Sequence, residues 1–234
     1  DLLFLNGAYA ESIVIPARIV EKNLLRLRDE TGFADAALAE PLACVVQGIE
    51  ETKLTAGERV LIIGSGPIGL MFCALAKHLG CDVTVAGRGE TRLQTAKRLG
   101  AAQVVDVSQT DLASPAFLSG AASRYDVVIE AVGKPETWEM TTRLVRKGGR
   151  VNFFGGCPAG TTVSLDTGLI HYSNLTLLAS FHHTPRTIRR ALGFIERGII
   201  RAADFVDGQC PLSELPALFS SMAAGNKAVK TLII

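Results

Sequence analysis

Three glycines lie at a spacing that can bind a phosphate group. Gly64, Gly66 and Gly69 form the pattern G-x-G-x-x-G after an apolar run and before a helical one. This context predicts a strand, a tight turn and a helix whose free N–H groups and partial positive charge hold phosphates. The predicted dinucleotide-binding residues of this turn are Gly64, Ser65, Gly66, Pro67, Ile68 and Gly69. The alternative is that the glycines only make a turn.

The end of the next expected strand bears on which dinucleotide would bind. In this type of fold an Asp or Glu there commonly bonds the ribose hydroxyls of NAD and would repel the extra phosphate of NADP. Gly87 stands in place of that acidic residue and leaves room for a 2′-phosphate. The guanidinium groups of Arg88 and Arg92 offer donors for it. We therefore predict that NADP is preferred over NAD; the alternative is that both arginines are solvated charges beside a helix.

Three further expected strands end in residues that could border the ribose and the nicotinamide. Open parallel sheets bind ligands at the carboxyl ends of their strands. Glycines at strand ends also make ordinary turns, which is the alternative here. The predicted contacts are Ala131, Val132, Gly133, Gly155, Gly156, Ser180 and Phe181.

Short apolar strands alternate with helical patterns through the middle of the chain. The expected strands are 59–63, 82–86, 103–107, 125–130, 151–156 and 175–180, and the expected helices between them include 67–80, 90–99 and 135–145. Such alternation predicts an α/β fold with a doubly wound, parallel, six-stranded sheet of the Rossmann type. Right-handed crossovers would bring the carboxyl ends of its strands to the same end of the sheet.

The two ends of the chain carry weaker patterns. Residues 7–15 and 24–28 indicate short extended segments, followed by helices over 31–43 and 42–51. Near the other end we expect helices over 185–197 and 211–224 and a last strand over 228–234. Because two short strands cannot form a sheet of their own, we expect the last strand to pair with those near the start.

The composition is that of an ordinary soluble protein. Of 234 residues, 48% are hydrophobic and 20% charged, and the net charge of +1 provides no argument for nucleic acid or a membrane surface as a partner. No apolar run is long enough to span a bilayer, so we expect a cytoplasmic protein. The five cysteines are scattered without a C-x-x-C pair, which predicts neither a disulfide framework nor a clustered zinc site.

Five segments together resemble the medium-chain zinc-dependent dehydrogenases, especially the sorbitol, threonine and secondary-alcohol branch. They are 7–11, 37–44, 64–69, 98–101 and 147–150. The resemblance implies hydride transfer between a secondary alcohol or polyol and NAD(P). It also implies a β-rich, GroES-like catalytic domain built from both chain ends, with domain ranges 1–44, 45–182 for the Rossmann domain, and 183–234 for a linking helix and the return to the catalytic domain.

The resemblance further implies a catalytic zinc ion, and here the chain departs from the family pattern. The family takes a cysteine and a Gly-His-Glu histidine from a region that would precede residue 1, and neither occurs in this chain. Glu40 matches the position of a third ligand or nearby carboxylate, although it could instead interact with N–H groups at a helix start. Because a catalytic zinc needs about three protein ligands, we expect a chain that lacks an amino-terminal part and binds cofactor without turnover.

Other interpretations stay open at this point. A non-catalytic nucleotide-binding module and a zinc-free enone or quinone reductase of the same superfamily are the alternatives, and Glu40 argues against the reductase. His171, His182 and His183 lie around the sixth expected strand, where we expect them to line a cleft or the surface. The resemblance also implies a homodimer or homotetramer formed through the edge of the coenzyme sheet.

Overall fold

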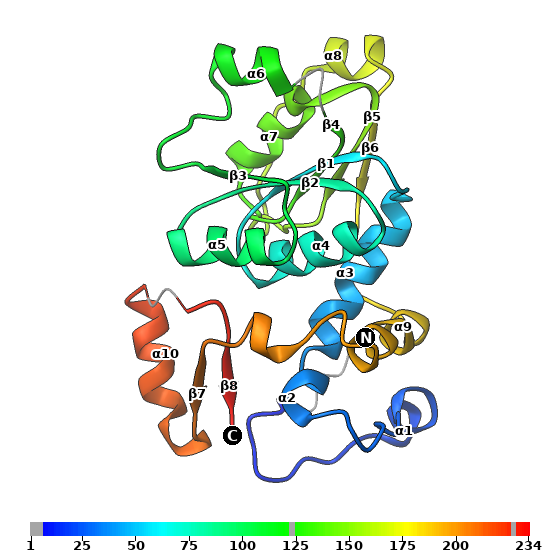
Figure 1. The fold of residues 1–234 in the computed structure, drawn as a ribbon, viewed down its shortest axis with the longest axis vertical. Helices are drawn as coiled ribbons and strands as arrows, with labels where there is room; N and C mark the ends of the chain where they lie inside the picture. The colour runs from blue at the N-terminus through cyan, green and yellow to red at the C-terminus, as the bar shows by residue number, and fades with distance from the viewer. Residues whose placement is uncertain (1–6, 122–124, 226–227) are drawn as a thin grey trace.

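The centre of the molecule is a parallel sheet of six strands (Figure 1). A computed structural model describes residues 7–121, 125–225 and 228–234. The strands are β1 (Arg59–Ile63), β2 (Asp82–Gly87), β3 (Gln103–Asp106), β4 (Tyr125–Glu130), β5 (Val145–Phe153) and β6 (Thr176–Ala179). Their order in the sheet is β3-β2-β1-β4-β5-β6, and every neighbouring pair is parallel. The predicted doubly wound fold is confirmed.

Helices cover both faces of this sheet. One face carries α4 (Pro67–His78), α5 (Glu90–Arg98) and α3 (Ala39–Thr52), with α9 (Pro185–Glu196) packed on α3. The other face carries α6 (Pro115–Ala121), α7 (Pro135–Leu144) and α8 (Thr167–Tyr172), of which α6 and α8 were not expected from the sequence. Within the described ranges, no helix combines the length and apolar character needed to cross a membrane.

The central strand β1 shows why its sequence is apolar throughout. Val60 and Ile62 pack in the core under α3 and α4, whereas Leu61 and Ile63 pack in the core on the α7 side. Alternate side chains of a strand point to opposite faces. A parallel strand covered by helices on both faces therefore reads as one continuous apolar run.

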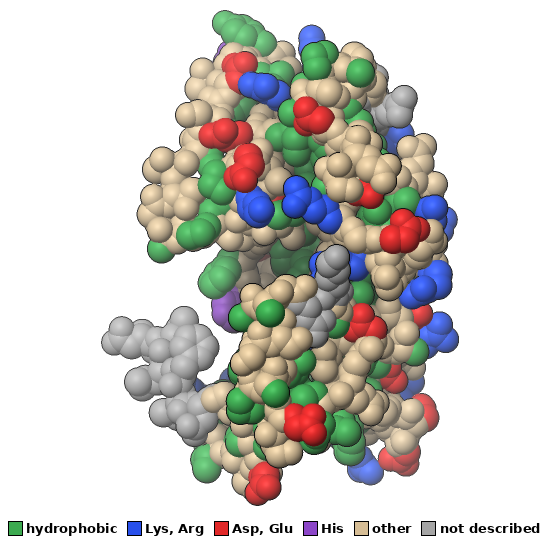
Figure 2. All heavy atoms as spheres, turned by 90° about the vertical axis from the view of Figure 1, so that its left-hand side faces the viewer, with side chains coloured by type: hydrophobic (Ala, Val, Ile, Leu, Met, Phe, Trp, Pro, Cys, Tyr) green, Lys and Arg blue, Asp and Glu red, His purple; other side chains and the backbone are tan. Residues whose placement is uncertain are grey.

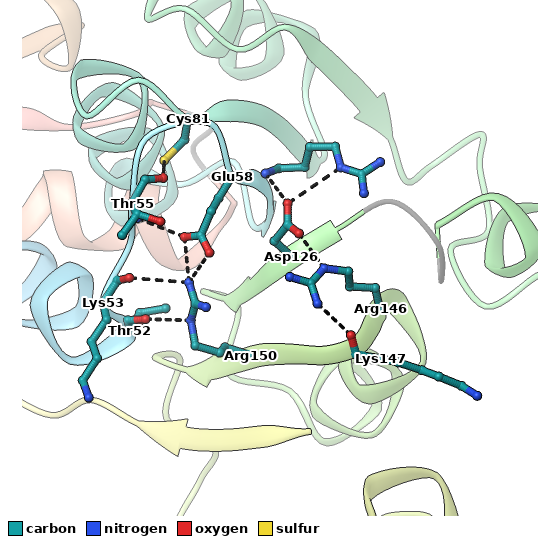
Figure 3. A network of polar contacts seen from close by, with 10 residues as sticks. Thr52, Lys53, Thr55, Glu58, Cys81, Asp126, Arg146, Lys147 and Arg150 are labelled. Carbon is teal, nitrogen blue, oxygen red and sulfur yellow. Dashed lines mark hydrogen bonds and ion pairs between the residues drawn. The ribbon is translucent and has the colours of Figure 1, made fainter. Parts of the chain in front are cut away.

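Two groups of ion pairs fasten the sheet at the amino ends of its strands (Figure 3). Asp126 of β4 accepts a hydrogen bond of 2.7 Å from the Arg59 backbone N and pairs with Arg146 of β5 at 2.5 Å. Arg150 of β5 pairs with Glu58 at 2.6 Å and also donates to the last carbonyl of α3. These contacts hold β1, β4, β5 and α3 together at the amino ends of the strands, which is the end of the sheet opposite the glycine turn.

The amino-terminal region differs from the prediction. Residues 7–15 do not form the expected strand, and residues 24–28 also lack regular structure; α1 (Ala17–Asn23) lies between these segments. Val14 is 81% exposed. A strand is stable only when a neighbour takes its backbone hydrogen bonds, and no described strand lies beside this segment. The expected helix over 31–43 is likewise divided into α2 (Phe33–Ala36) and the start of α3.

The last strand pairs within the carboxyl-terminal region. β8 (Thr231–Ile233) lies parallel to β7 (Gly208–Cys210) in a separate two-stranded sheet, so the expected pairing with the start of the chain is wrong. The remaining elements are η1 (Ala202–Asp204), η2 (Leu212–Glu214) and α10 (Leu215–Ala223). In Figure 1 the helices α1, α2 and α10 and the small β7-β8 sheet lie below the six-stranded sheet, and α3 leads from one part to the other.

Candidate functional site

A cavity of about 740 Å³ opens at the carboxyl ends of β1, β2, β3 and β4. Figure 2 shows this side of the molecule hollowed at mid-height, with Lys and Arg side chains beside the hollow. Open α/β sheets bind ligands in this position, where the strand order reverses. The predicted residues that line the cavity are Gly64, Ser65, Gly66, Gly87, Arg88, Arg92, Ala131 and Val132.

The glycine turn has the geometry that each of its glycines requires. Gly64 has φ of +123°, and a Cβ at this position would lie 2.9 Å from the Ala131 carbonyl oxygen. A Cβ on Gly69 would overlap the Gly64 carbonyl, so only glycine lets α4 start this close to β1. Gly66, the N-cap of α4, has open space beside it. An anion can therefore approach the start of α4, where Gly66 provides no side-chain cap.

Gly87 and Ser65 lie against each other between β2 and the turn. A Cβ on Gly87 would overlap the Ser65 side chain. The Ser65 Oγ donates to the Arg88 carbonyl at 2.9 Å and accepts from the Arg88 N–H at 3.1 Å. This arrangement leaves no room for an acidic side chain at Gly87 and fixes the backbone of Arg88 at the cavity wall. Arg92 also lines the cavity and donates to the Ala228 carbonyl at 2.9 Å.

The loop after β3 supplies cavity residues that sequence reasoning missed. It turns because the Asp106 carboxylate accepts from the Ser108 hydroxyl at 2.7 Å and from the Ser108 N–H at 2.9 Å. These bonds, together with the charge of Arg88, hold the pKa of Asp106 below its usual range. The missed residues of this loop are Val107, Ser108, Gln109, Thr110, Asp111, Leu112 and Ala113. Also missed were Ile63 and Ala86 on β1 and β2, and Lys134, Glu136, Thr137 and Met140 before and on α7. No motif marks them, but the expected end of the third strand indicated where the loop would lie.

The remaining predicted contacts lie outside the cavity lining. They are Pro67, Ile68, Gly69, Gly133, Gly155, Gly156, Ser180 and Phe181. Phe181 is 87% exposed, whereas Ser180 is buried and accepts a hydrogen bond of 3.0 Å from Asn152. A Cβ on Gly133 would lie 2.5 Å from the Gly156 carbonyl oxygen, so the loops after β4 and β5 touch. The roles of these residues toward a cofactor stay predictions.

A second group of reactive side chains lies near the start of α3. Glu40, Cys44 and His182 each place one possible ligand atom within 4.8 Å of the other two. The Cys44 thiol donates to the Glu40 carboxylate at 3.5 Å, and His183 Nε2 lies 3.5 Å from the same oxygen. Burial raises the pKa of Cys44 to about 12, with further contributions from the charge of Glu40 and their hydrogen bond. Carboxylate, thiolate and imidazole are the ligands that zinc takes in proteins.

The sequence did not indicate that these histidines meet Glu40. His182 and His183 follow β6, while Glu40 and Cys44 lie one helical turn apart on α3. His182 is exposed, as expected, and has φ of +65°, which is uncommon for a residue other than glycine. His171 is exposed on α8 and does not belong to this group.

Comparisons with known proteins agree with this geometry. The family described as zinc-binding dehydrogenase matches residues 67–197, more than half of the chain. D-altritol 5-dehydrogenase of Agrobacterium fabrum is 32% identical over 96% of this chain and 65% of its own length. D-arabitol-phosphate dehydrogenase of Enterococcus avium is 30% identical over 97% of this chain and 64% of its own length. The chain thus spans about 65% of the length of these relatives.

A solved structure leads to the same conclusion. A crystal structure from Sinorhizobium meliloti 1021 with NADP bound superposes with a TM-score of 0.83 at 32% identity. The match covers 90% of this chain and 62% of the other. The family match, the sheet order and the glycine turn agree with one another and confirm the resemblance noted in the sequence. The chain belongs to the zinc-dependent medium-chain dehydrogenase family.

Proposed function

We propose that this protein is an NADP-preferring, zinc-dependent oxidoreductase that transfers hydride between a secondary alcohol or polyol and the nicotinamide. The observation that carries the proposal is the cavity at the strand ends, bordered by the glycine turn and by Arg88. Family membership supports the reaction class, and the names of the two relatives, D-altritol 5-dehydrogenase and D-arabitol-phosphate dehydrogenase, support the substrate class.

Different parts of the site bind different parts of the cofactor. The start of α4 takes the pyrophosphate, because Gly66 leaves its N–H groups accessible. The adenosine half lies between the end of β2 and the loop after β3. Arg88 then pairs with the 2′-phosphate, and the uncharged Gly87 does not repel it. The structure with NADP bound supports this choice of cofactor.

Glu40 would hold the zinc, with Cys44 and His182 within reach of the same ion. Their oxygen, sulfur and nitrogen donors fit a zinc site. When bound, zinc polarises the alcohol oxygen and lowers its pKa. Glu40 and Cys44 belong to the segment 1–44, and His182 is the last residue of 45–182. His183 begins the last segment and lies 3.5 Å from the Glu40 carboxylate, which supports a catalytic region built from both chain ends. We propose the division 1–44, 45–182 and 183–234 on this basis, and association through the β6 edge of the sheet.

A fluorescence titration with NADPH and NADH tests the proposal. We expect saturable binding with NADPH preferred, and Arg88→Ala should weaken NADPH by about tenfold because a charge-assisted contact is lost, while NADH changes little. Arg143→Ala, which removes an exposed arginine on α7, is the control. A preference for NADH would overturn the choice of NADP, and binding of neither would overturn the cofactor site. We further propose that this chain alone, given NADP, zinc and polyols, shows no turnover, because the cysteine and Gly-His-Glu histidine that the family pattern uses do not occur in it. Appreciable turnover would contradict this.

A further inference from the structure

A fully buried carboxylate lies beneath the floor of the cavity. Glu130 is the last residue of β4, and its exposed fraction is 0%. Burial raises its pKa, against the effect of the hydrogen bonds that it accepts. A buried ionisable group is costly unless its hydrogen-bond partners are in place. Its partners therefore indicate what it does.

The side chain of Glu130 folds back onto the loop that follows its own strand. Oε1 accepts from the Val132 N–H at 2.9 Å, from the Gly133 N–H at 3.0 Å and from the Thr137 hydroxyl at 2.7 Å. Val132 and Thr137 both line the cavity. The carboxylate thus fixes the loop after β4 to the first turn of α7.

Glu130 also contacts the neighbouring loop after β5. Its carbonyl accepts from the N–H groups of Phe154 and Gly155 at 3.0 and 2.8 Å. A Cβ on Gly155 would lie 2.6 Å from Oε2, so this glycine leaves the space that the carboxylate fills. Trp138 Nε1 donates to the Gly155 carbonyl at 2.8 Å, so α7 also contacts the loop after β5. One residue therefore connects both loops expected to border the nicotinamide ribose.

We propose that Glu130 is a positioning residue that holds the loops after β4 and β5 in the conformation that receives the nicotinamide half of the cofactor. This inference rests on the proposed function and adds a residue outside the cavity lining to it. Both carboxylate oxygens face N–H donors: Val132 and Gly133 on Oε1, and Gly133 again on Oε2 at 3.2 Å. A carboxylate accepts on both oxygens, whereas a glutamine must turn its N–H₂ toward one of these donors. Loops ordered before binding avoid an entropic cost when the cofactor arrives.

Glu130→Gln tests this with two probes, NADPH and adenosine 2′,5′-bisphosphate, which carries only the adenosine half. We expect NADPH to bind about tenfold more weakly, as for other residues that orient a site, and adenosine 2′,5′-bisphosphate to bind as before. A milder test is a pair of variants at Thr137. Thr137→Val removes one donor and should weaken the binding of NADPH by about fivefold. Thr137→Ser keeps the hydroxyl and should bind NADPH as the unaltered chain does. The pair decides the question if Glu130→Gln fails to fold.

The outcomes separate this inference from the proposed function. If the unaltered chain binds both probes and the variants bind NADPH equally well, the positioning role is wrong. Equal weakening of both probes, with a lower unfolding temperature, would mean that Glu130 serves only the fold, and would also overturn it. If the unaltered chain binds neither probe, the proposed function fails and this inference fails with it.

Discussion

At the scale of single residues, the group around Glu40 joins side chains whose positions in sequence are far apart. Glu40 and Cys44 share one face of α3, since residues four apart on a helix are neighbours. His182 reaches them from beyond β6. Because a carboxylate, a thiol and an imidazole meet there, we expect the removal of any one of them to lower the affinity for a metal ion.

We expect Glu40→Gln and Cys44→Ser each to weaken zinc binding by about tenfold or more, because each removes one of about three protein ligands. Competition of Zn²⁺ with bound Co²⁺ gives the affinity. The cobalt spectrum also reports the ligands, because a thiolate ligand adds a charge-transfer band that Cys44→Ser should abolish.

Cys157→Ser is the matched control, since Cys157 is likewise partly buried but lies near Glu130 and Glu136. If Cys157→Ser removes the band and Cys44→Ser does not, the assignment of Cys44 is wrong. Zinc affinity unchanged in Glu40→Gln would likewise remove Glu40 from the site.

Residue types revealed only part of the site. The glycine turn was predictable because its backbone geometry demands glycine at Gly64 and Gly69. The loop over 107–113 was not, because its residues reach the cavity through the fold and no residue type is required there. The meeting of Glu40 with His182 was missed for the same reason.

At the scale of elements, the capping of α9 sets the direction of the segment that carries both histidines. The Thr184 hydroxyl accepts from the Thr187 N–H at 3.2 Å, and the Thr187 hydroxyl accepts from the Thr184 N–H at 2.9 Å. This reciprocal capping box satisfies two N–H groups at the helix start. Arg186 and Arg190 then pair with Glu50 and hold α9 against α3.

Thr184→Ala should lower the free energy of unfolding by about 1 kcal/mol, since it removes the N-cap acceptor. Urea unfolding followed by circular dichroism measures the change. Thr184→Ser keeps the hydroxyl and should remain close to the unaltered chain. Equal stability of the Ala and Ser variants would show that the cap contributes nothing measurable.

The six strands of the sheet and the helices α4, α5 and α7 were predictable because apolar runs alternate with helical periods there, whereas the short helices α6 and α8 were missed. The structure of the segments at the two ends of the chain was not predictable in this way. Residues 7–15 are rich in β-forming side chains, but β-propensity reflects packing on a half-buried sheet surface, and Ile13, Val14 and Ile15 are exposed instead. The partner of β8 was missed because β7 is only three residues long and carries no alternating pattern.

At the scale of the whole molecule, the ion pairs of Asp126 link the two halves of the sheet. Burial alone would raise the pKa of Asp126, but the Arg59 N–H, the Arg146 guanidinium and the charge of Arg59 outweigh it and lower the pKa. A lowered carboxyl pKa stabilises the folded state above the ordinary pKa of about 4, and this contribution is lost as the pH falls through the lowered value.

We therefore expect Asp126→Asn to destabilise the chain near pH 7 and to differ less and less from the unaltered chain below about pH 4. Urea unfolding at a series of pH values measures this. Asp82→Asn, which alters an exposed carboxylate at the start of β2, is the control and should leave the pH profile unchanged. A constant difference between Asp126→Asn and the unaltered chain at all pH values would contradict the role given to Asp126.

The strand order also has a consequence for how the chain folds. Within each half, β1-β2-β3 and β4-β5-β6, neighbouring strands are also consecutive along the chain, whereas β1 and β4 are paired across the two halves. Contacts of large sequence separation form slowly because loop closure must come first. The seam between β1 and β4 is therefore expected to close late, and a ligand in the cavity would bridge it. Such a ligand should slow the separation of the halves and so lengthen the lifetime of the folded state.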